Sequence, residues 1–237
     1  MKLPSVLGSN MVLQRECDAN LWGWASPSKK VTVTTSWDGR KYATRADADG
    51  NWLLKVATPA AGGPYTIRIS DGEPVVLENV MVGEVWICSG QSNMAFRVDE
   101  LVDSQRKELT GYAGKQPQIR LFNMEPRWFT NAVEWDEAVM DSLNRLQYYH
   151  DTQWTVCNEQ TADRFSAVAF SFGRMLSDRM QVPVGLILNA VGGSGTEAWI
   201  DRKTLEFDFT DILYNWTEND FIQDWVRGRA ALNIKKS

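Results

Sequence analysis

The sequence is poor in the side chains that most often serve as general bases and metal ligands. Its 237 residues include one histidine, His150, and three cysteines, Cys17, Cys88 and Cys157, which lie far apart. Structural zinc sites usually pair their ligands about two to four residues apart, so the sequence predicts no metal site. Three cysteines leave one unpaired, and no spacing argues for a disulfide. Cys88 lies in an apolar run and is expected to be buried.

Basic tracts and long apolar runs are also missing. The formal net charge is −5 at pH 7, which argues against a nucleic-acid partner because phosphate binding needs a basic face. No apolar run is long enough to span a membrane, so we predict no membrane partner. The first residues, Met1-Lys2-Leu3-Pro4, are too short and too polar for a signal peptide.

Residues 1–80 have the pattern of a small all-β domain. Short runs rich in β-branched and aromatic residues are separated by turn signals such as Asp38-Gly39 and Asp49-Gly50. Strands at this spacing, with no helical periodicity between them, predict a small antiparallel β-sandwich. This domain has no cluster of acids and bases, so we expect a structural or docking role.

Residues 81–237 have an α/β pattern. Apolar strands are predicted at residues 85–88, 118–122 and 184–188. A helix is predicted over 163–180 with its first residue as N-cap, whereas residues 125–159 favour a long insertion loop. Strands alternating with helices predict a parallel sheet covered on both faces, so the strand at 85–88 should have little solvent on either side.

Polar and glycine-rich sequences follow two of these strands. They are G-Q-S-N-M at residues 90–94 and N-A-V-G-G-S-G at residues 189–195. Ligand sites of open α/β sheets lie beyond the carboxyl ends of the strands. A serine there can act as a nucleophile, and glycines let backbone N–H groups approach an oxyanion. Either sequence alone is also typical of an ordinary helix cap or loop, but the two together favour acyl transfer through Ser92.

The motif around Ser92 is not the G-x-S-x-G elbow of the α/β-hydrolases, because Met94 occupies its fifth position. Instead, G-E-V-W leading into G-Q-S-N-M, at residues 83–94, resembles the first block of the sialate O-acetylesterase family of SGNH hydrolases. Further segments resemble its N-terminal β-domain and its second block: M-V-L-Q at 11–14, W-G-W-A at 22–25, D-G-N-W at 49–52, F-S-A-V at 165–168, and V-G-G-S through E-A-W-I at 191–200.

The resemblance implies a partial SGNH-type parallel sheet with helices in residues 81–237, preceded by the β-sandwich domain in residues 1–80. It implies that Ser92 is the nucleophile and that its N–H and that of Gly192 or Gly193 form part of the oxyanion hole. Family members remove acetyl groups from sugars such as sialic acid through an acetyl-serine intermediate, with no metal or other cofactor. The expected partner is therefore an acetylated carbohydrate, and the expected location is periplasmic or secreted.

Two later blocks of the family, resembling W-Y-Q-G-E and D-x-x-H, are not found. Gln147 stands three residues before His150, so the spacing of the second block fails. A serine without a base is a poor nucleophile, so we expect this chain to be a truncated, incomplete enzyme. A short sheet would also leave an apolar edge open to self-association or to a missing C-terminal segment.

Two alternatives stay open. The chain has eleven tryptophans, so it could be a non-catalytic carbohydrate-binding or assembly module that uses the β-domain and the Trp-rich loops. It could also be a different hydrolase that recruits His150 as its base.

Overall fold

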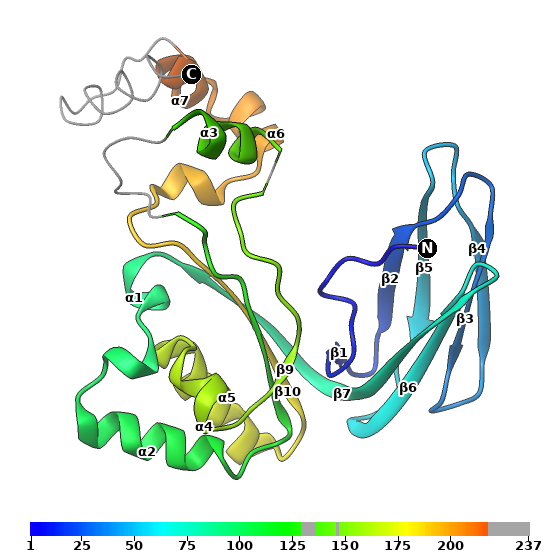
Figure 1. The fold of residues 1–237 in the computed structure, drawn as a ribbon, viewed down its shortest axis with the longest axis horizontal. Coiled ribbons are helices and arrows are strands. Elements are labelled where there is room, and N and C mark those ends of the chain that lie inside the picture. The colour runs from blue at the N-terminus through cyan, green and yellow to red at the C-terminus, as the bar shows by residue number, and fades with distance from the viewer. Residues whose placement is uncertain (129–135, 146, 218–237) are drawn as a thin grey trace. The chain divides into compact units, whose positions relative to one another are not determined.

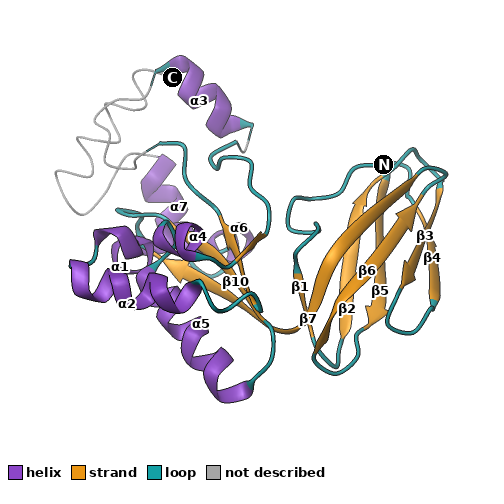
Figure 2. Cartoon of the chain, turned by 60° about the horizontal axis from the view of Figure 1, so that its bottom comes forward, coloured by secondary structure: helices purple, strands orange, loops and turns teal. Residues whose placement is uncertain are grey.

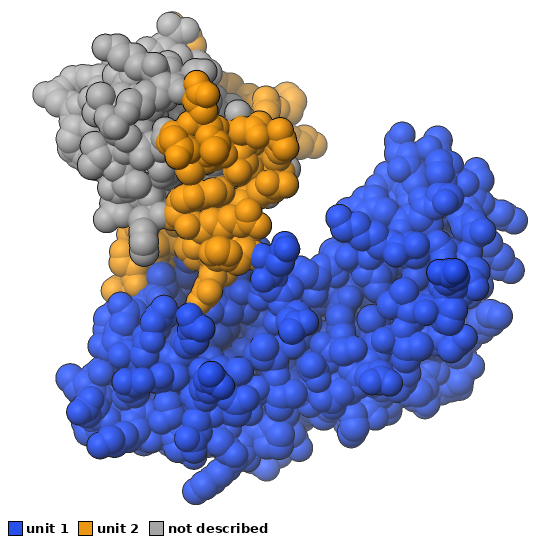
Figure 3. All heavy atoms as spheres, in the orientation of Figure 1, with its two compact units in different colours: residues 1–89, 94–124, 151–190 blue, residues 90–93, 125–150, 191–237 orange. Residues whose placement is uncertain are grey.

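The computed structural model describes residues 1–128, 136–145 and 147–217. The chain divides into two compact units (Figure 3). Unit 1 consists of residues 1–89, 94–124 and 151–190, and unit 2 consists of residues 90–93, 125–150 and 191–237.

The strands of the N-terminal part of unit 1 belong to two sheets (Figure 2). In the smaller sheet, β2 (Asp18–Trp24) pairs antiparallel with β5 (Asn51–Ala57). In the larger one, β3 (Lys30–Thr35) lies between β4 (Lys41–Arg45) and β6 (Gly62–Ser70), and β6 pairs with the first half of β7 (Pro74–Gly90). The predicted antiparallel pairing of this region is thus observed.

Alternating side chains explain why these strands form sheets. In β5 the side chains of Trp52, Leu54 and Val56 are buried, whereas those between them are exposed. They share one core with inward residues of the larger sheet, including Val33 and Ile69. This period of two is what a half-buried strand requires.

Strand β7 is 17 residues long and continues beyond the β-rich region. Residues 81–83 pair in parallel with β1 (Val12–Gln14). The second half of β7 lies beside β10 (Val184–Ala190). The division predicted between residues 80 and 81 therefore falls within one strand, and it stays a prediction.

The second half of β7 begins the α/β part of unit 1, in which the strand order is β7-β10-β8-β9. Strand β10 is parallel to β8 (Ile119–Asn123), and β9 (Thr155–Val156) is antiparallel to β8. The predicted apolar strands are present, but the main sheet is mixed rather than wholly parallel.

Helices α2 (Asp103–Ala113), α4 (Glu159–Asp163) and α5 (Ala167–Met180) share a second core with this part of the sheet (Figure 1). Helix α5 packs on β10, and Gly173 allows the close approach because a Cβ there would lie 2.5 Å from Leu186. The remaining short elements are α1 (Ser92–Ala95), α3 (Glu137–Asn144), α6 (Arg202–Phe207), α7 (Thr210–Thr217) and the 3-10 turns Val98–Glu100 and Thr196–Trp199.

The expectation that the strand at residues 85–88 is buried on both faces was wrong. Cys88 is buried, but Trp86 is 43% exposed and Ile87 is 70% exposed. Among the described residues, β10 is the strand beside this half of β7, so its other edge has no neighbouring strand. Trp86 packs edge-on against Phe172 of α5, with ring centroids 5.2 Å apart.

Two local predictions also need correction. Asp163 is the last residue of α4, where it binds Arg106, and the N-cap of α5 is Ser166, whose Oγ accepts a hydrogen bond from Ala169 N. The segment 125–159 contains α3 and β9 in addition to loop. Both elements are shorter than the window over which hydrophobic periodicity is informative. Residues 129–135 and 146 of that segment lie outside the described residues.

No helix in the described ranges is long and apolar enough to cross a membrane. All three cysteines are free thiols.

Candidate active site

Ser92 lies just beyond the carboxyl end of β7, at the first residue of α1 (Figure 1). Gly90, the last residue of the strand, has φ = 151°, a conformation that favours glycine and turns the chain out of the sheet. The Ser92 side chain is exposed, and its Oγ donates a long hydrogen bond to Oε1 of Gln91 at 3.5 Å. The turn therefore presents a serine hydroxyl to solvent.

The loop after β10 meets this turn within unit 2. The backbone N–H of Val191 donates to the carbonyl oxygen of Gly90 at 2.9 Å. The side-chain amide of Gln91 donates to the carbonyl oxygen of Ser194 at 3.3 Å. The two sequences that follow the predicted strands are thus brought together, as expected for neighbouring strands that end on the same side of a sheet.

Ser194 organises the glycine-containing loop. Its Oγ donates to the carbonyl oxygen of Val191 at 2.8 Å and accepts a hydrogen bond from the indole N–H of Trp199 at 3.0 Å. The two bonds tie the loop to the 3-10 turn at Thr196–Trp199. The Trp199 contact supports a structural role for that side chain. Glu197, in the same turn, is exposed.

Gly192 and Gly193 are both exposed but differ in conformation. Gly193 has φ = 79°, a conformation that L side chains rarely adopt, whereas a Cβ at Gly192 would meet nothing within 4 Å. In the described part of the chain, the N–H of Gly193 has no hydrogen-bond acceptor. The N–H of Ser92, at the start of a helix, has no acceptor within that helix. Such N–H groups can donate to an oxyanion.

A general base for Ser92 is not found within residues 1–128, 136–145 and 147–217. His150 is exposed, and its backbone N–H donates to the carbonyl oxygen of Glu125 at 2.9 Å. Across those ranges, no imidazole or carboxylate forms a hydrogen bond with Ser92 Oγ. The described site therefore contains an exposed serine hydroxyl and N–H donors, without a group placed to take the proton.

The described residues do not form a cysteine-nucleophile site or a metal site. Burial raises the pKa of the Cys88 thiol to about 11, so Cys88 stays protonated at neutral pH and is a poor nucleophile. In the part of the chain that the structure describes, no group of three or more His, Cys, Asp or Glu residues is arranged to hold a metal ion.

The sequence did not predict the hydrogen bond from Gln91 to Ser194. The two residues are 103 positions apart, and no local pattern links them. The hydrogen bond between Trp199 and Ser194 was also missed, although both lie in the segment that carried the family resemblance.

The chain is similar to known proteins in sequence and in fold. The profile of a family described as "Carbohydrate esterase, sialic acid-specific acetylesterase" matches residues 82–220. The chain is 30% identical over 221 residues to a sialate O-acetylesterase of Pongo abelii, covering 86% of this chain and 40% of that protein. The corresponding protein of Homo sapiens is 30% identical over 220 residues, with the same coverage.

A solved structure is also similar. The crystal structure of a carbohydrate acetylesterase from Xanthomonas citri matches with a TM-score of 0.71 and 30% sequence identity, over 87% of this chain and 44% of that one. The chain thus spans about two fifths of the length of these relatives. By its profile match and these similarities, the chain belongs to the sialic acid-specific acetylesterase family of carbohydrate esterases.

Proposed function

We propose that this chain supplies the nucleophile and the oxyanion donors of a serine esterase that removes O-acetyl groups from sialic acid or a related carbohydrate. The observation that carries the proposal is the junction at Ser92. An exposed serine after β7 lies beside the glycine loop after β10, and the Val191–Gly90 and Gln91–Ser194 hydrogen bonds hold the two segments together.

The proposed reaction has two steps. Ser92 Oγ attacks the acetyl carbonyl carbon and loses its proton to a base, and the base returns the proton to the sugar oxygen as the ester bond breaks. Water, deprotonated by the same base, then attacks the acetyl-serine and releases acetate and the free Ser92 hydroxyl. In both steps the N–H groups of Ser92 and of Gly193 or Gly192 would stabilise the negative charge on the carbonyl oxygen.

The proposal needs a base from outside the described residues. The relatives are longer than this chain, which covers about 40% of the mammalian proteins. A further segment of a longer protein, or a second chain, could bring the base to Ser92. A periplasmic or secreted location stays a prediction.

The test is acetate release from 4-nitrophenyl acetate and from an O-acetylated sialic acid. We would compare the unmodified chain with Ser92→Ala and with Ser89→Ala, which removes an exposed serine three residues earlier. We expect Ser89→Ala to keep the activity and Ser92→Ala to lose all of it. Release that persists in Ser92→Ala would refute Ser92 as nucleophile.

A labelling experiment covers the case of slow turnover. A fluorophosphonate should attach to Ser92, as read by peptide mass spectrometry, even if the label accumulates over hours. Equal labelling of Ser89 and Ser92 would mean that Ser92 is no more nucleophilic than an ordinary surface serine.

A further inference from the structure

The outward face of the β2–β5 sheet exposes large apolar side chains. Trp22 and Trp24 are 38% and 42% exposed, while Leu21 and Gly23, which alternate with them, are buried. Leu53 on β5 lies opposite Trp22 in the strand register and is 57% exposed. Two tryptophans and a leucine on one outward face form an apolar patch of the kind that marks binding surfaces.

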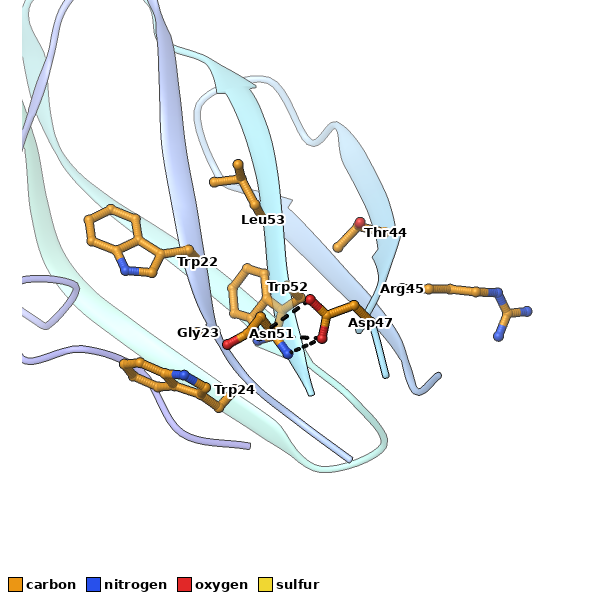
Figure 4. A pocket seen from close by; sticks show the side chains of 9 residues that line it. All are labelled: Trp22, Gly23, Trp24, Thr44, Arg45, Asp47, Asn51, Trp52 and Leu53. Carbon is orange, nitrogen blue, oxygen red and sulfur yellow. Dashed lines mark hydrogen bonds between the residues drawn. The ribbon is translucent and has the colours of Figure 1, made fainter. Parts of the chain in front are cut away.

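Polar groups of fixed geometry border this patch (Figure 4). The Asp47 carboxylate accepts hydrogen bonds from the N–H groups of Asp49 at 2.9 Å and Asn51 at 2.8 Å, and it also contacts the Asn51 side-chain amide. The backbone bond from Asn51 is the main reason that the pKa of Asp47 is lowered, so its carboxylate is ionised at neutral pH. Arg45 donates to the carbonyl oxygen of Ser28 at 3.1 Å.

These side chains line one cavity of about 400 Å³, within the usual range of small-ligand pockets. Trp52 contributes to its wall and is 3% exposed. Within the described residues, the indole N–H of Trp52 is buried without a hydrogen-bond acceptor. Trp52 alternates with Leu53 along β5 and faces the shared core, so this N–H is closed off from a ligand on the outward face.

We propose that this cavity, the β2–β5 pocket, binds a neutral oligosaccharide. The negative face of an indole attracts the polarised C–H groups of a pyranose ring. Alternate residues of a strand are about 7 Å apart, so Trp22 and Trp24 can contact neighbouring rings of one chain. The Lys2 ammonium, 5.8 Å from the centroid of the Trp24 ring, helps to orient that ring.

The polar groups favour a neutral sugar over two other ligands. Sugar hydroxyls both donate and accept, so they can donate to Asp47 and accept from the Asn51 side-chain amide. A polyproline peptide also stacks on tryptophan, but it has carbonyl acceptors and few donors for the carboxylate. An acidic sugar would be repelled by Asp47. The pocket does not depend on Ser92, so this inference stands independently of the proposed esterase activity.

The test is isothermal titration of the full chain with cellohexaose, xylohexaose and mannohexaose. We expect at least one to bind with Kd below about 1 mM, and Trp22→Ala or Trp24→Ala to weaken that binding by about tenfold or more. Trp86→Ala, which removes a similarly exposed tryptophan outside the pocket, and Ser92→Ala should leave Kd unchanged.

A second measurement avoids substitutions that could disturb folding. The bound hexasaccharide should protect Trp22 and Trp24 of the unmodified chain from oxidation by N-bromosuccinimide, as read by peptide mass spectrometry. The inference is overturned if none of the three sugars binds at about 10 mM, if the Trp22→Ala/Trp24→Ala variant binds as tightly as the unmodified chain, or if a proline-rich peptide binds in their place.

Discussion

The backbone N–H of Val191 donates a hydrogen bond to the carbonyl oxygen of Gly90 at 2.9 Å. At the other end of the same two strands, Glu84 N donates to the carbonyl oxygen of Pro183, also at 2.9 Å. The two bonds show that β7 and β10 run in the same direction and end together. This pairing brings the Ser92 turn to the glycine loop and makes the site possible.

The two glycines of the loop should respond differently to a methyl group. Gly193→Ala forces a side chain into φ = 79° and should lower the free energy of unfolding by about 1–2 kcal/mol. Gly192→Ala should change it by less than about 0.5 kcal/mol, because a Cβ there meets nothing within 4 Å. Urea unfolding of both variants measures the difference. Equal losses would contradict the assigned backbone conformation.

Gly83 of β7 lies so close to Pro183, the residue before β10, that no larger side chain should fit there. A Cβ at Gly83 would lie 2.0 Å from the carbonyl oxygen of Pro183, so Gly83→Ala should cost about 3 kcal/mol or more. The matched control is Gly111→Ala in the exposed interior of α2, where the Cβ has free space. That change should stabilise the chain by about 0.5–1 kcal/mol. Comparable urea midpoints for the two variants would refute this packing.

The three thiols should react in a set order. Burial raises the pKa of Cys88 to about 11 and that of Cys157 to about 12, whereas Cys17 is half-buried. At pH 8, N-ethylmaleimide should therefore label Cys17 first, and the other two only after urea is added. Mass spectrometry of peptides reads the order. Fast labelling of Cys157 in the native chain would show that its surroundings open readily.

The thiols of Cys88 and Cys157 should make the free energy of unfolding depend on pH. Their folded pKa values exceed the ordinary value of 9.0, so their contribution to the free energy of unfolding is complete below pH 9.0. It is lost as the pH rises through about 11 and 12. Cys88→Ala/Cys157→Ala should therefore lose less stability than the unmodified chain between pH 9 and 11. If the free energy of unfolding fell equally with pH in the two proteins, the raised pKa values would be contradicted.

An external base should restore reactivity at Ser92. If the described site lacks only the proton acceptor, added imidazole should raise acetate release from 4-nitrophenyl acetate by roughly tenfold over the Ser92→Ala variant under the same conditions. The variant corrects for catalysis by free imidazole. Identical rates for the two proteins at every imidazole concentration would mean that more than the base is missing.

The exposed half of β7 should make the chain self-associate. Ile87 is 70% exposed and Trp86 43% exposed, and one edge of this half-strand has no neighbouring strand among the described residues. Such edges promote pairing between chains. We expect the sedimentation coefficient to rise with concentration, and Ile87→Lys to suppress the rise. A concentration-independent monomer would refute the expectation of self-association.

The local features of the fold were predictable from the sequence. The turns at Asp38-Gly39 and Asp49-Gly50 depend on glycines with φ = 67° and 85°, and their sequences are common turn signals. Burial and capping were less predictable. Asp163 and Ser166 are both good N-cap residues. Arg106, on another helix, binds the Asp163 carboxylate, and Ser166 caps α5 instead.

By itself, the sequence determined that Ser92 and the Gly192-Gly193 pair each follow an apolar strand, because hydrophobic runs and turn residues act over a few positions. Only the tertiary structure decided that these two ends meet. Their pairing depends on contacts between residues about 100 positions apart, such as Gly83 against Pro183 and Gln91 against Ser194. No short-range pattern encodes such contacts, since they arise from the packing of whole strands and helices into a shared core.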